Sequence, residues 1–312
     1  MPLLHLNWND APPAECRGGA VTVGNFDGVH LGHASLMQTL RAAASAMSGP
    51  AVIVSFDPHP MLLLAPERFQ PPLNTPEDRA AYLEQAGADK VLMLRTTPEL
   101  LRLTPDAFFG RILRERLSAR AIVEGFNFRF GHDRAGDNDA LARLCRESRT
   151  AFTVVPPLQL DGVPVSSSRI RNALIAGEVT EATRLMGRAY RLWGEVGKGQ
   201  RRGRTLGFPT ANLERIQTLI PGDGVYAVRA ELDGWSWPGA ANIGPNPTFG
   251  EHERKLEVHL LDFNGDLYGH KLGVTFVKRM RGTRPFAGPD DLVRQLRNDV
   301  AQARTIVAEK QK

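Results

Sequence analysis

The stretch AVTVGNFDGVHLGH, residues 20–33, decides the fold of the first half of the chain. Its apolar start, residues 20–24, predicts a buried strand, and the Ala- and Leu-rich residues 34–47 predict a helix. His30 and His33 are three residues apart and therefore share one face of a helical turn. Gly32 lets a phosphate approach the backbone, where a helix N-terminus offers free N–H groups. The stretch thus predicts a nucleotide-phosphate site, and two surface histidines beside a loop are the alternative.

Strand-like and helix-like segments alternate around this stretch. Further strands are predicted at residues 51–56, 90–94, 121–124 and 152–155. Thr75-Pro76 and Thr104-Pro105 each combine a capping hydroxyl with a proline at the first helical position, which predicts helices to about residues 86 and 117. This alternation is typical of a parallel sheet covered by helices, with ligands at the carboxyl ends of the strands.

The pattern changes after Gly187, where strand-like runs follow one another between Gly and Pro turns. These runs lie at residues 190–196, 225–232, 239–243, 256–263 and 273–278. They predict a small antiparallel β-barrel, closed by a helix over residues 290–307. The predicted fold is therefore α/β over residues 1–186, followed by a barrel domain over residues 187–312.

Composition narrows the functional classes. The chain has 312 residues and a net charge of +5, with basic clusters at residues 198–204 and 279–284. A basic surface suits nucleic acid or phosphate esters. Because no zinc-finger spacing or RNA-binding aromatic signature accompanies the clusters, we expect small phosphorylated ligands and no nucleic acid. Apolar runs are too short to span a membrane. Cys16 and Cys145 have neither metal-ligand nor disulfide spacing, which fits structural thiols in the cytoplasm.

A second polar stretch, VSSSRIR at residues 165–171, supplies hydroxyl and guanidinium donors at a predicted helix start. A serine cap beside solvated arginines is the alternative. HxGH followed by such a segment resembles the nucleotidyltransferases related to class I aminoacyl-tRNA synthetases. Longer motifs resemble the bacterial bifunctional riboflavin kinase/FMN adenylyltransferases over nearly the whole chain. They are GNFDGVHLGH (residues 24–33), FDPHP (56–60), GFNFRFG (125–131) and RAGD (134–137).

This resemblance implies a Rossmann-like nucleotidyltransferase domain in which FMN attacks the α-phosphorus of ATP to give FAD and pyrophosphate. It implies that His30 and His33 stabilise the developing charge. It further implies that Ser167, Ser168 and Arg171 hold the β- and γ-phosphates. The remaining residues implied to bind ATP or FMN are Gly24, Phe26, Asp27, Gly28, Gly32 and Asn127. Many relatives carry Asp at position 127 and Thr at position 168.

The run GKGQRRGRTLGFPTAN, residues 197–212, combines glycines and basic residues that can surround phosphates. A flexible basic loop is the alternative. Thr210 and Asn212 offer oxygen ligands of the kind Mg²⁺ prefers. In KLEVHLLDF, residues 255–263, strand alternation places Glu257 and His259 on one face. Glu257 is either a general base or an exposed strand carboxylate.

These segments resemble the riboflavin kinase module of the same family, together with GVYAV (residues 224–228), NIGPNPTF (242–249) and DLYG (266–269). The resemblance implies that Thr210 and Asn212 bind Mg²⁺ and ATP phosphates, and that Glu257 takes the proton of the riboflavin 5′-hydroxyl. The residues implied to bind ATP or flavin are Gly197, Gly199, Gly203, Gly207, Pro209 and Arg281. Residues 280–286, MRGTRPF, depart from the usual family version.

Three other functions remain possible at this point: an adenylyltransferase whose kinase module is lost, one with another phosphorylated substrate, or a non-catalytic flavin- or RNA-binding regulator. Intact His30, His33, Thr210, Asn212 and Glu257 favour the bifunctional enzyme. We expect ATP, riboflavin, FMN and FAD as its small-molecule substrates or products. We also expect a monomer or weak homo-oligomer without membrane partners.

Overall fold

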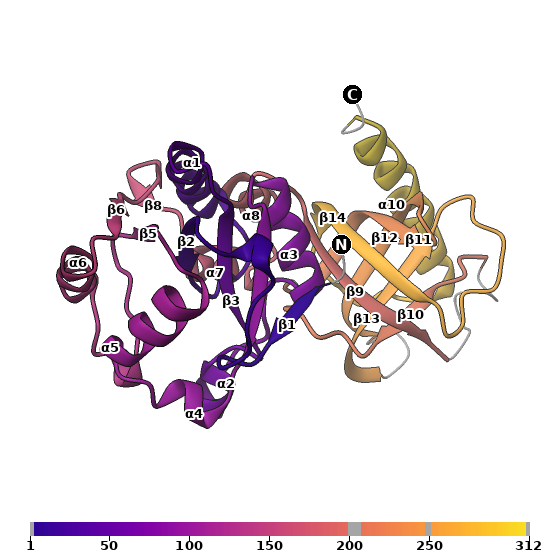
Figure 1. Cartoon of the computed structure of the whole chain (residues 1–312). Coiled ribbons are helices and arrows are strands. Elements are labelled where there is room, and N and C mark those ends of the chain that lie inside the picture. Colours follow the sequence, from indigo (N-terminus) through magenta and orange to yellow (C-terminus); the bar gives the residue numbers. More distant parts are fainter. Residues whose placement is uncertain (1–2, 199–206, 247–250, 310–312) are drawn as a thin grey trace. The chain divides into compact units, whose positions relative to one another are not determined.

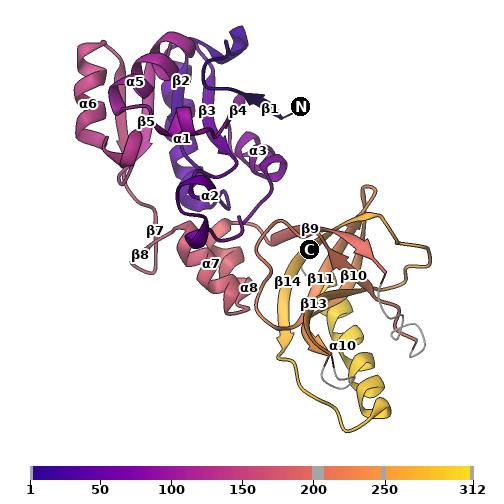
Figure 2. The ribbon, with the colours of Figure 1, turned by 90° about the horizontal axis from the view of Figure 1, so that it is seen from below.

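The computed structural model describes residues 3–198, 207–246 and 251–309. Its contacts divide the chain into two compact units. The first unit contains Met1–Gln70 and Thr75–Ser166, and the second contains Pro71–Asn74 and Ser167–Lys312. Figures 1 and 2 show the elements of each unit in two views.

The first unit is built on a six-stranded sheet in which every pair of neighbouring strands is parallel. Its strands are β1 (Leu4–Leu6), β2 (Ala20–Val23), β3 (Ala51–Asp57), β4 (Lys90–Arg95), β5 (Ala121–Gly125) and β6 (Ala151–Val155). The spatial order is β1-β4-β3-β2-β5-β6. From β2 the chain adds β3 and then β4 on one side, and it then adds β5 and β6 on the other side of β2. The point between β2 and β5 is therefore the switch point of the strand order, where such sheets bind ligands.

Helices and short turns connect these strands. They are η1 (Ala14–Cys16), α1 (Leu31–Ala46), α2 (Met61–Leu64), η2 (Pro66–Arg68), α3 (Pro76–Gln85), α4 (Pro98–Leu101), α5 (Pro105–Phe108), η3 (Phe109–Arg116), η4 (His132–Arg134) and α6 (Asn138–Glu147). A small hairpin of β7 (Gln159–Leu160) and β8 (Val163–Pro164) ends the unit. Thr75 and Thr104 cap α3 and α5 as predicted, because their hydroxyls accept from the N–H groups of Asp78 and Ala107.

Both faces of the sheet are buried, which explains the apolar character of its strands. Along β3, Val52 and Val54 face a core that includes Phe108 and Ile112 of α5 and η3. Ile53, between them, faces the opposite core, to which α1 and α3 contribute side chains. The sheet is thus enclosed between α1 and α3 on one side and α5, η3 and α6 on the other (Figure 1).

The second unit contains a closed barrel with strand order β10-β13-β12-β11-β14-β9. Neighbouring strands are antiparallel throughout. The strands are β9 (Tyr190–Gly197), β10 (Ala211–Glu214), β11 (Gly224–Leu232), β12 (Trp235–Asn246), β13 (Glu251–Leu260) and β14 (Lys271–Arg281). Helix α10 (Pro289–Glu309) packs Ala303, Ile306 and Val307 against Ala227 and Val277 of the barrel (Figure 2).

Two helices precede the barrel within the same unit, α7 (Ser167–Ile175) and α8 (Val179–Met186). The N–H of Gly222 donates to the Leu174 carbonyl at 2.8 Å, and an Arg279 guanidinium N–H donates to the Ala176 carbonyl at 3.4 Å. The predicted domain boundary at 186/187 therefore falls inside a compact unit, between α8 and β9. The boundary at 186/187 stays a prediction about which residues belong to each of the two functional domains.

The predicted fold class, a parallel α/β domain followed by an antiparallel barrel with a C-terminal helix, is confirmed. Local details differ. The helix predicted from Thr104 to about residue 117 changes after Phe108 into the π-helical segment η3. Strands β1 and β10 were not predicted. Among the described residues, no helix combines the length and apolarity that crossing a membrane requires.

Candidate active sites

His30 and His33 meet at the start of α1. His30 is the N-cap residue, and its Nδ1 accepts a hydrogen bond from the His33 backbone N–H at 3.3 Å. In return, the His33 Nδ1 accepts from the His30 backbone N–H at 3.2 Å. The two rings are stacked with centroids 3.7 Å apart. This reciprocal capping fixes both imidazoles at a helix N-terminus, where the backbone favours negative charge.

The loop before these histidines is conformationally strained. Phe26 and Val29 have φ values of 48° and 38°, a region that non-glycine residues rarely adopt and that is an outlier for a β-branched residue such as valine. Arg79 of α3 supports the loop from beneath, because its guanidinium donates to the Asn25 carbonyl at 2.8 Å and to the Ser55 hydroxyl at 3.1 Å. The hydrogen bonds of Arg79 therefore help to hold the strained conformation of this loop.

Arg79 itself is 6% exposed. Burial lowers the pKa of its guanidinium, and the nearby carboxylates of Asp27, Asp57 and Glu77 oppose that shift. A buried guanidinium with carboxylates around it remains a cation and a strong donor. Sequence reasoning did not single out Arg79, because its partners lie far away in the sequence.

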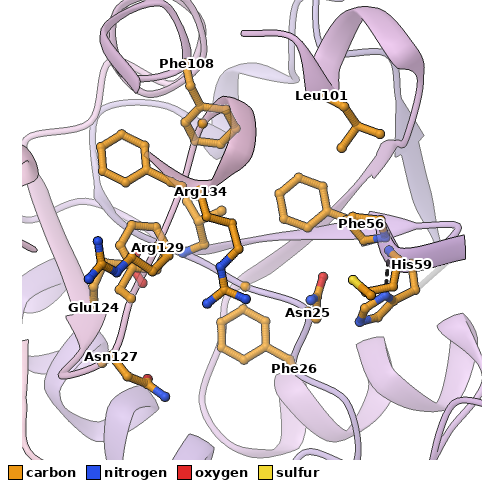
Figure 3. Close-up of a pocket in the computed structure, with 18 of the residues that line it drawn as sticks. Asn25, Phe26, Phe56, His59, Leu101, Phe108, Glu124, Asn127, Arg129 and Arg134 are labelled. Atoms are coloured by element: carbon orange, nitrogen blue, oxygen red, sulfur yellow. Dashed lines mark hydrogen bonds between the residues drawn. The ribbon is translucent and has the colours of Figure 1, made fainter. Parts of the chain in front are cut away.

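A pocket of about 430 Å³ opens beside this loop (Figure 3). Five phenylalanines line it together with aliphatic side chains: Phe26, Phe56, Phe108, Phe128 and Phe130. Polar groups of Asn25, His33, His59 and Asn127 also reach its wall. An apolar aromatic cavity with a few convergent polar groups is the usual form of a site for a planar heterocycle. Of the predicted site residues, the lining includes Gly24, Phe26, His33 and Asn127.

A buried carboxyl group also lines this pocket. Glu124 of β5 is 2% exposed, and its Oε1 accepts from the Val23 backbone N–H at 2.8 Å. The Thr22 hydroxyl donates to its Oε2 at 3.4 Å. Burial raises the pKa of the Glu124 carboxyl well above its ordinary value, and the two hydrogen bonds only partly oppose that rise. Sequence reasoning missed this residue as well.

The serines and arginine predicted to hold phosphates lie at the start of α7, as their helix-start pattern indicated. They belong to the second unit, whereas His30 and His33 belong to the first. The Arg171 guanidinium donates to the Pro71 carbonyl at 2.5 Å, and Arg169 pairs with Glu181 at 2.9 Å. The phosphate-binding roles of Ser167, Ser168 and Arg171 therefore stay predictions.

In the barrel, three polar residues form a row across adjacent strands. Glu257 of β13 lies opposite Asn212 of β10 on one side and opposite Asn242 of β12 on the other. Side chains of directly paired residues share a face and have Cβ atoms about 4.5–5.5 Å apart. Leu256 and Val258, which flank Glu257, are buried, as the alternation predicted. Strand register thus places Asn242 in the same polar row, which the sequence pattern did not predict.

His259, on the same face of β13 as Glu257, holds the segment that carries Thr210. The His259 Nδ1–H donates to the Pro209 carbonyl at 2.7 Å, since a carbonyl can only accept. The His259 ring also makes an edge contact with Phe208, with centroids 5.7 Å apart. Thr210 follows as an exposed residue directly before β10. His259 therefore orients the turn that presents Thr210 and Asn212.

The remaining residues predicted to bind ATP or flavin in the barrel are four glycines and one arginine for which the structure gives different outcomes. Gly199 and Gly203 lie outside the described residues. An added Cβ atom at Gly197 would lie 2.2 Å from the Glu214 Oε1, so a larger residue there would displace the Glu214 side chain. Gly207 has a left-handed φ of 84°. Arg281 makes a two-nitrogen ion pair with Asp299 of α10, with distances of 3.1 and 2.7 Å.

Both cysteines are buried, free thiols of the first unit. Burial raises the pKa of Cys16, and it raises the pKa of Cys145 to about 11. Because the thiolate is the reactive form of cysteine, these shifts disfavour a nucleophilic role for either residue.

Known proteins resemble this chain along almost its entire length. The bifunctional riboflavin kinase/FMN adenylyltransferase of Pseudomonas fluorescens is 40% identical over 301 residues, which cover 94% of each chain. The enzyme of the same name from Escherichia coli K12 is 36% identical, over 96% of this chain and 95% of its own. The crystal structure of a protein described as a macrolide-efflux protein from Streptococcus pneumoniae is 32% identical, with a TM-score of 0.86 over 97% of this chain and 99% of that chain.

A parallel nucleotide-binding sheet with paired histidines at a helix start, followed by a closed barrel, defines a two-domain, nucleotide-dependent transferase. The sequence model of FAD synthetase matches residues 13–169, and that of riboflavin kinase matches residues 186–307. The chain belongs to the family of bifunctional riboflavin kinase/FMN adenylyltransferases. Its substrates are accordingly ATP, riboflavin and FMN, and FAD is the final product.

Proposed function

We propose that residues 1–186 adenylylate FMN and that residues 187–312 phosphorylate riboflavin, each with the site residues predicted from the sequence. The observation that supports the first assignment best is the stacked His30–His33 pair at the N-terminus of α1. His33 also lines the aromatic pocket, whose five phenylalanines suit the flavin ring system.

The adenylyl step needs little beyond positioning and charge stabilisation. The FMN phosphate is already anionic, so it attacks the α-phosphorus of ATP without a general base, and pyrophosphate leaves. His30 and His33 stabilise the charge that develops on the phosphate oxygens. In this proposal, Ser167, Ser168 and Arg171 hold the β- and γ-phosphates, and Asn127 contacts the nucleotide or the flavin phosphate.

The kinase step begins with an alcohol, which is a poor nucleophile. Glu257 accepts the proton of the riboflavin 5′-hydroxyl as the hydroxyl oxygen attacks the γ-phosphorus of ATP; the bond from the γ-phosphorus to the bridging oxygen breaks, and ADP leaves. Its neighbours Asn212 and Asn242 flank it across the strands. The surrounding barrel is closed, so this row has fixed geometry on both sides.

We also propose that Mg²⁺ binds beside this row. The oxygen donors of Thr210 and Asn212 fit the ion, because Mg²⁺ prefers hard oxygen ligands and usually completes its coordination with water and substrate phosphates. When bound, the ion neutralises negative charge on the phosphates of ATP. The residues named above do the remaining work of orientation and proton transfer.

The test is to incubate the full chain with riboflavin, ATP and Mg²⁺ and to separate the flavins by chromatography. We expect FMN first and FAD afterwards, and FAD directly when FMN is supplied. FAD formation from FMN without FMN formation from riboflavin would contradict the kinase assignment. Loss of both reactions on chelation, with recovery on added Mg²⁺, is the expected result for the metal.

A further inference from the structure

A tight turn at the rim of the aromatic pocket carries two arginines close to its ends. Phe130 and Gly136 close the turn by exchanging backbone hydrogen bonds of 3.1 and 3.0 Å. The turn lies between β5 and α6, and Arg129 and Arg134 both line the pocket. Its position places these cations beside the phenylalanines proposed to bind the flavin ring.

The turn is anchored to the body of the first unit. Gly131 has a φ of 74°, and an added Cβ there would lie 2.6 Å from the Pro105 nitrogen. The His132 backbone N–H donates to the Leu103 carbonyl at 2.7 Å, and its Nδ1 lies 3.1 Å from the Leu101 carbonyl oxygen. These contacts fix the turn, so its side chains project in defined directions.

Two consecutive residues of the turn adopt left-handed backbone conformations. Asp133 has a φ of 51° and Arg134 a φ of 57°. Such conformations are uncommon for residues other than glycine, and they gather at binding and catalytic sites, where surrounding structure maintains them. In Figure 3 the Arg134 side chain extends into the pocket in the neighbourhood of Phe26.

The charges around the pocket are not equally neutralised. Arg129 pairs with Asp137 at 3.3 Å, and Asp133 lies 3.4 Å from the His132 Nε2. Within the described part of the chain, the Arg134 guanidinium has neither a hydrogen-bond acceptor nor an ion-pair partner. A fork of N–H donors without an anion, held over an aromatic pocket, is suited to bind a phosphate group in two-point geometry.

We propose that Arg134 binds the phosphate of FMN and thereby lets the adenylyl site distinguish FMN from riboflavin. This inference rests on the proposed function of the pocket. The enzyme uses both flavins, and they share the same ring system, so an aromatic pocket alone cannot separate them. Only the phosphate differs, and a cation without a partner in the protein recognises that difference.

The test compares the full-length protein with Arg134→Ala and Arg134→Lys. FAD formation gives the KM for FMN and for ATP. Riboflavin serves as an inhibitor of the same reaction when each variant also carries Glu257→Gln, which is expected to slow the conversion of riboflavin to FMN and to leave FAD formation intact. Losing a charge-assisted hydrogen bond is expected to raise the KM for FMN about 10- to 100-fold. The inhibition constant of riboflavin and the KM for ATP are expected to stay within about two-fold of wild type. Arg134→Lys keeps the charge without the fork, so it should recover part of the lost affinity.

Arg143→Ala is the matched control, because Arg143 is an exposed arginine of the same unit, paired with Glu147 and away from the pocket lining. The kinase reaction of each variant reports on folding. Parallel rises of the FMN KM and the riboflavin inhibition constant would overturn the proposal, as they would show that Arg134 only shapes the ring site. A rise confined to ATP, or no change, would also overturn it. Absence of FAD formation by the wild type would instead refute the proposed function.

Discussion

The Glu124 carboxyl accepts a hydrogen bond from the Val23 backbone N–H across the gap between β5 and β2. Backbone pairing of these strands is confined to Ala20 with Ala121 and Val21 with Ile122. Beyond that point the strands separate, and a side chain takes the place of the next ladder bond. The separation lies where the strand order reverses and where the pocket opens, so Glu124 lets the sheet part without leaving a buried N–H unsatisfied.

The raised pKa of Glu124 makes the stability of the first unit depend on pH. An unfolded glutamate has a pKa of about 4.3. Because the folded value is higher, the folded state binds more protons between the two values. Stability is therefore greatest below the unfolded pKa and falls as the pH rises toward the folded pKa. Glu124→Gln should remove this dependence, so in urea denaturation the variant gains stability relative to wild type as the pH rises from about 4.3 toward the folded pKa. Equal pH dependence in both proteins would contradict the assignment.

His30→Ala and His33→Ala should each reduce FAD formation from FMN by about 10²- to 10³-fold, because each removes a preorganised charge-stabilising group. FMN formation from riboflavin should stay near the wild-type rate in both variants. Chromatographic rates for the two reactions provide the measurement. Normal FAD formation in both variants would show that the stacked pair has no catalytic role.

Glu257→Gln should slow FMN formation by about 10²- to 10⁴-fold, since the amide keeps the size of the side chain but cannot accept the hydroxyl proton as a base. The KM for ATP should change little. Supplied FMN should still be converted to FAD by the same variant, because that reaction starts from an anion. A wild-type rate of FMN formation, with chemistry rate-limiting, would make Glu257 an ordinary surface carboxylate. A joint fall of both activities would point to damaged folding.

A fragment of residues 187–312 should make FMN from riboflavin and no FAD. A fragment of residues 167–312 should do the same with a higher melting temperature, because Val179, Leu185 and Met186 of α8 are buried in the second unit. Thermal unfolding followed by circular dichroism compares the two fragments. FAD production by either fragment would contradict the assignment of the two reactions, and equal melting temperatures would show that α7 and α8 do not stabilise the barrel.

The sequence was most informative where local pattern and tertiary structure agree. Residues 20–33 predicted the strand, the histidine pair and the helix start, because strand burial and helix capping are short-range properties. The alternation around Glu257 likewise predicted which side chains are buried. β10 escaped prediction although its four residues alternate between buried and more exposed positions, and it brings Asn212 opposite Glu257.

The residues that sequence reasoning missed act over long separations. Glu124 bonds a backbone group 101 residues away, and Arg79 bonds one 54 residues away. Nothing in the neighbourhood of either residue indicates such a partner, since the fold alone brings the groups together. The position of Asn242 beside Glu257 depends likewise on strand register. The sequence placed His259 on the face of Glu257, but its hydrogen bond to the Pro209 carbonyl depends on the path of that turn.

The alternation of side chains along β13 restricts which insertions and deletions this strand can tolerate. Gain or loss of one residue within the strand would turn Glu257 toward the barrel interior and bring a neighbouring apolar side chain to the reacting face. Because β13 is paired with β10 on one side and with β12 on the other, a shift of one residue would disrupt the pairing on both sides. Length variation should therefore be tolerated at the Asp233–Gly234 turn between β11 and β12. Within β13, where the kinase site is proposed, insertions and deletions should be absent or should involve two residues at a time.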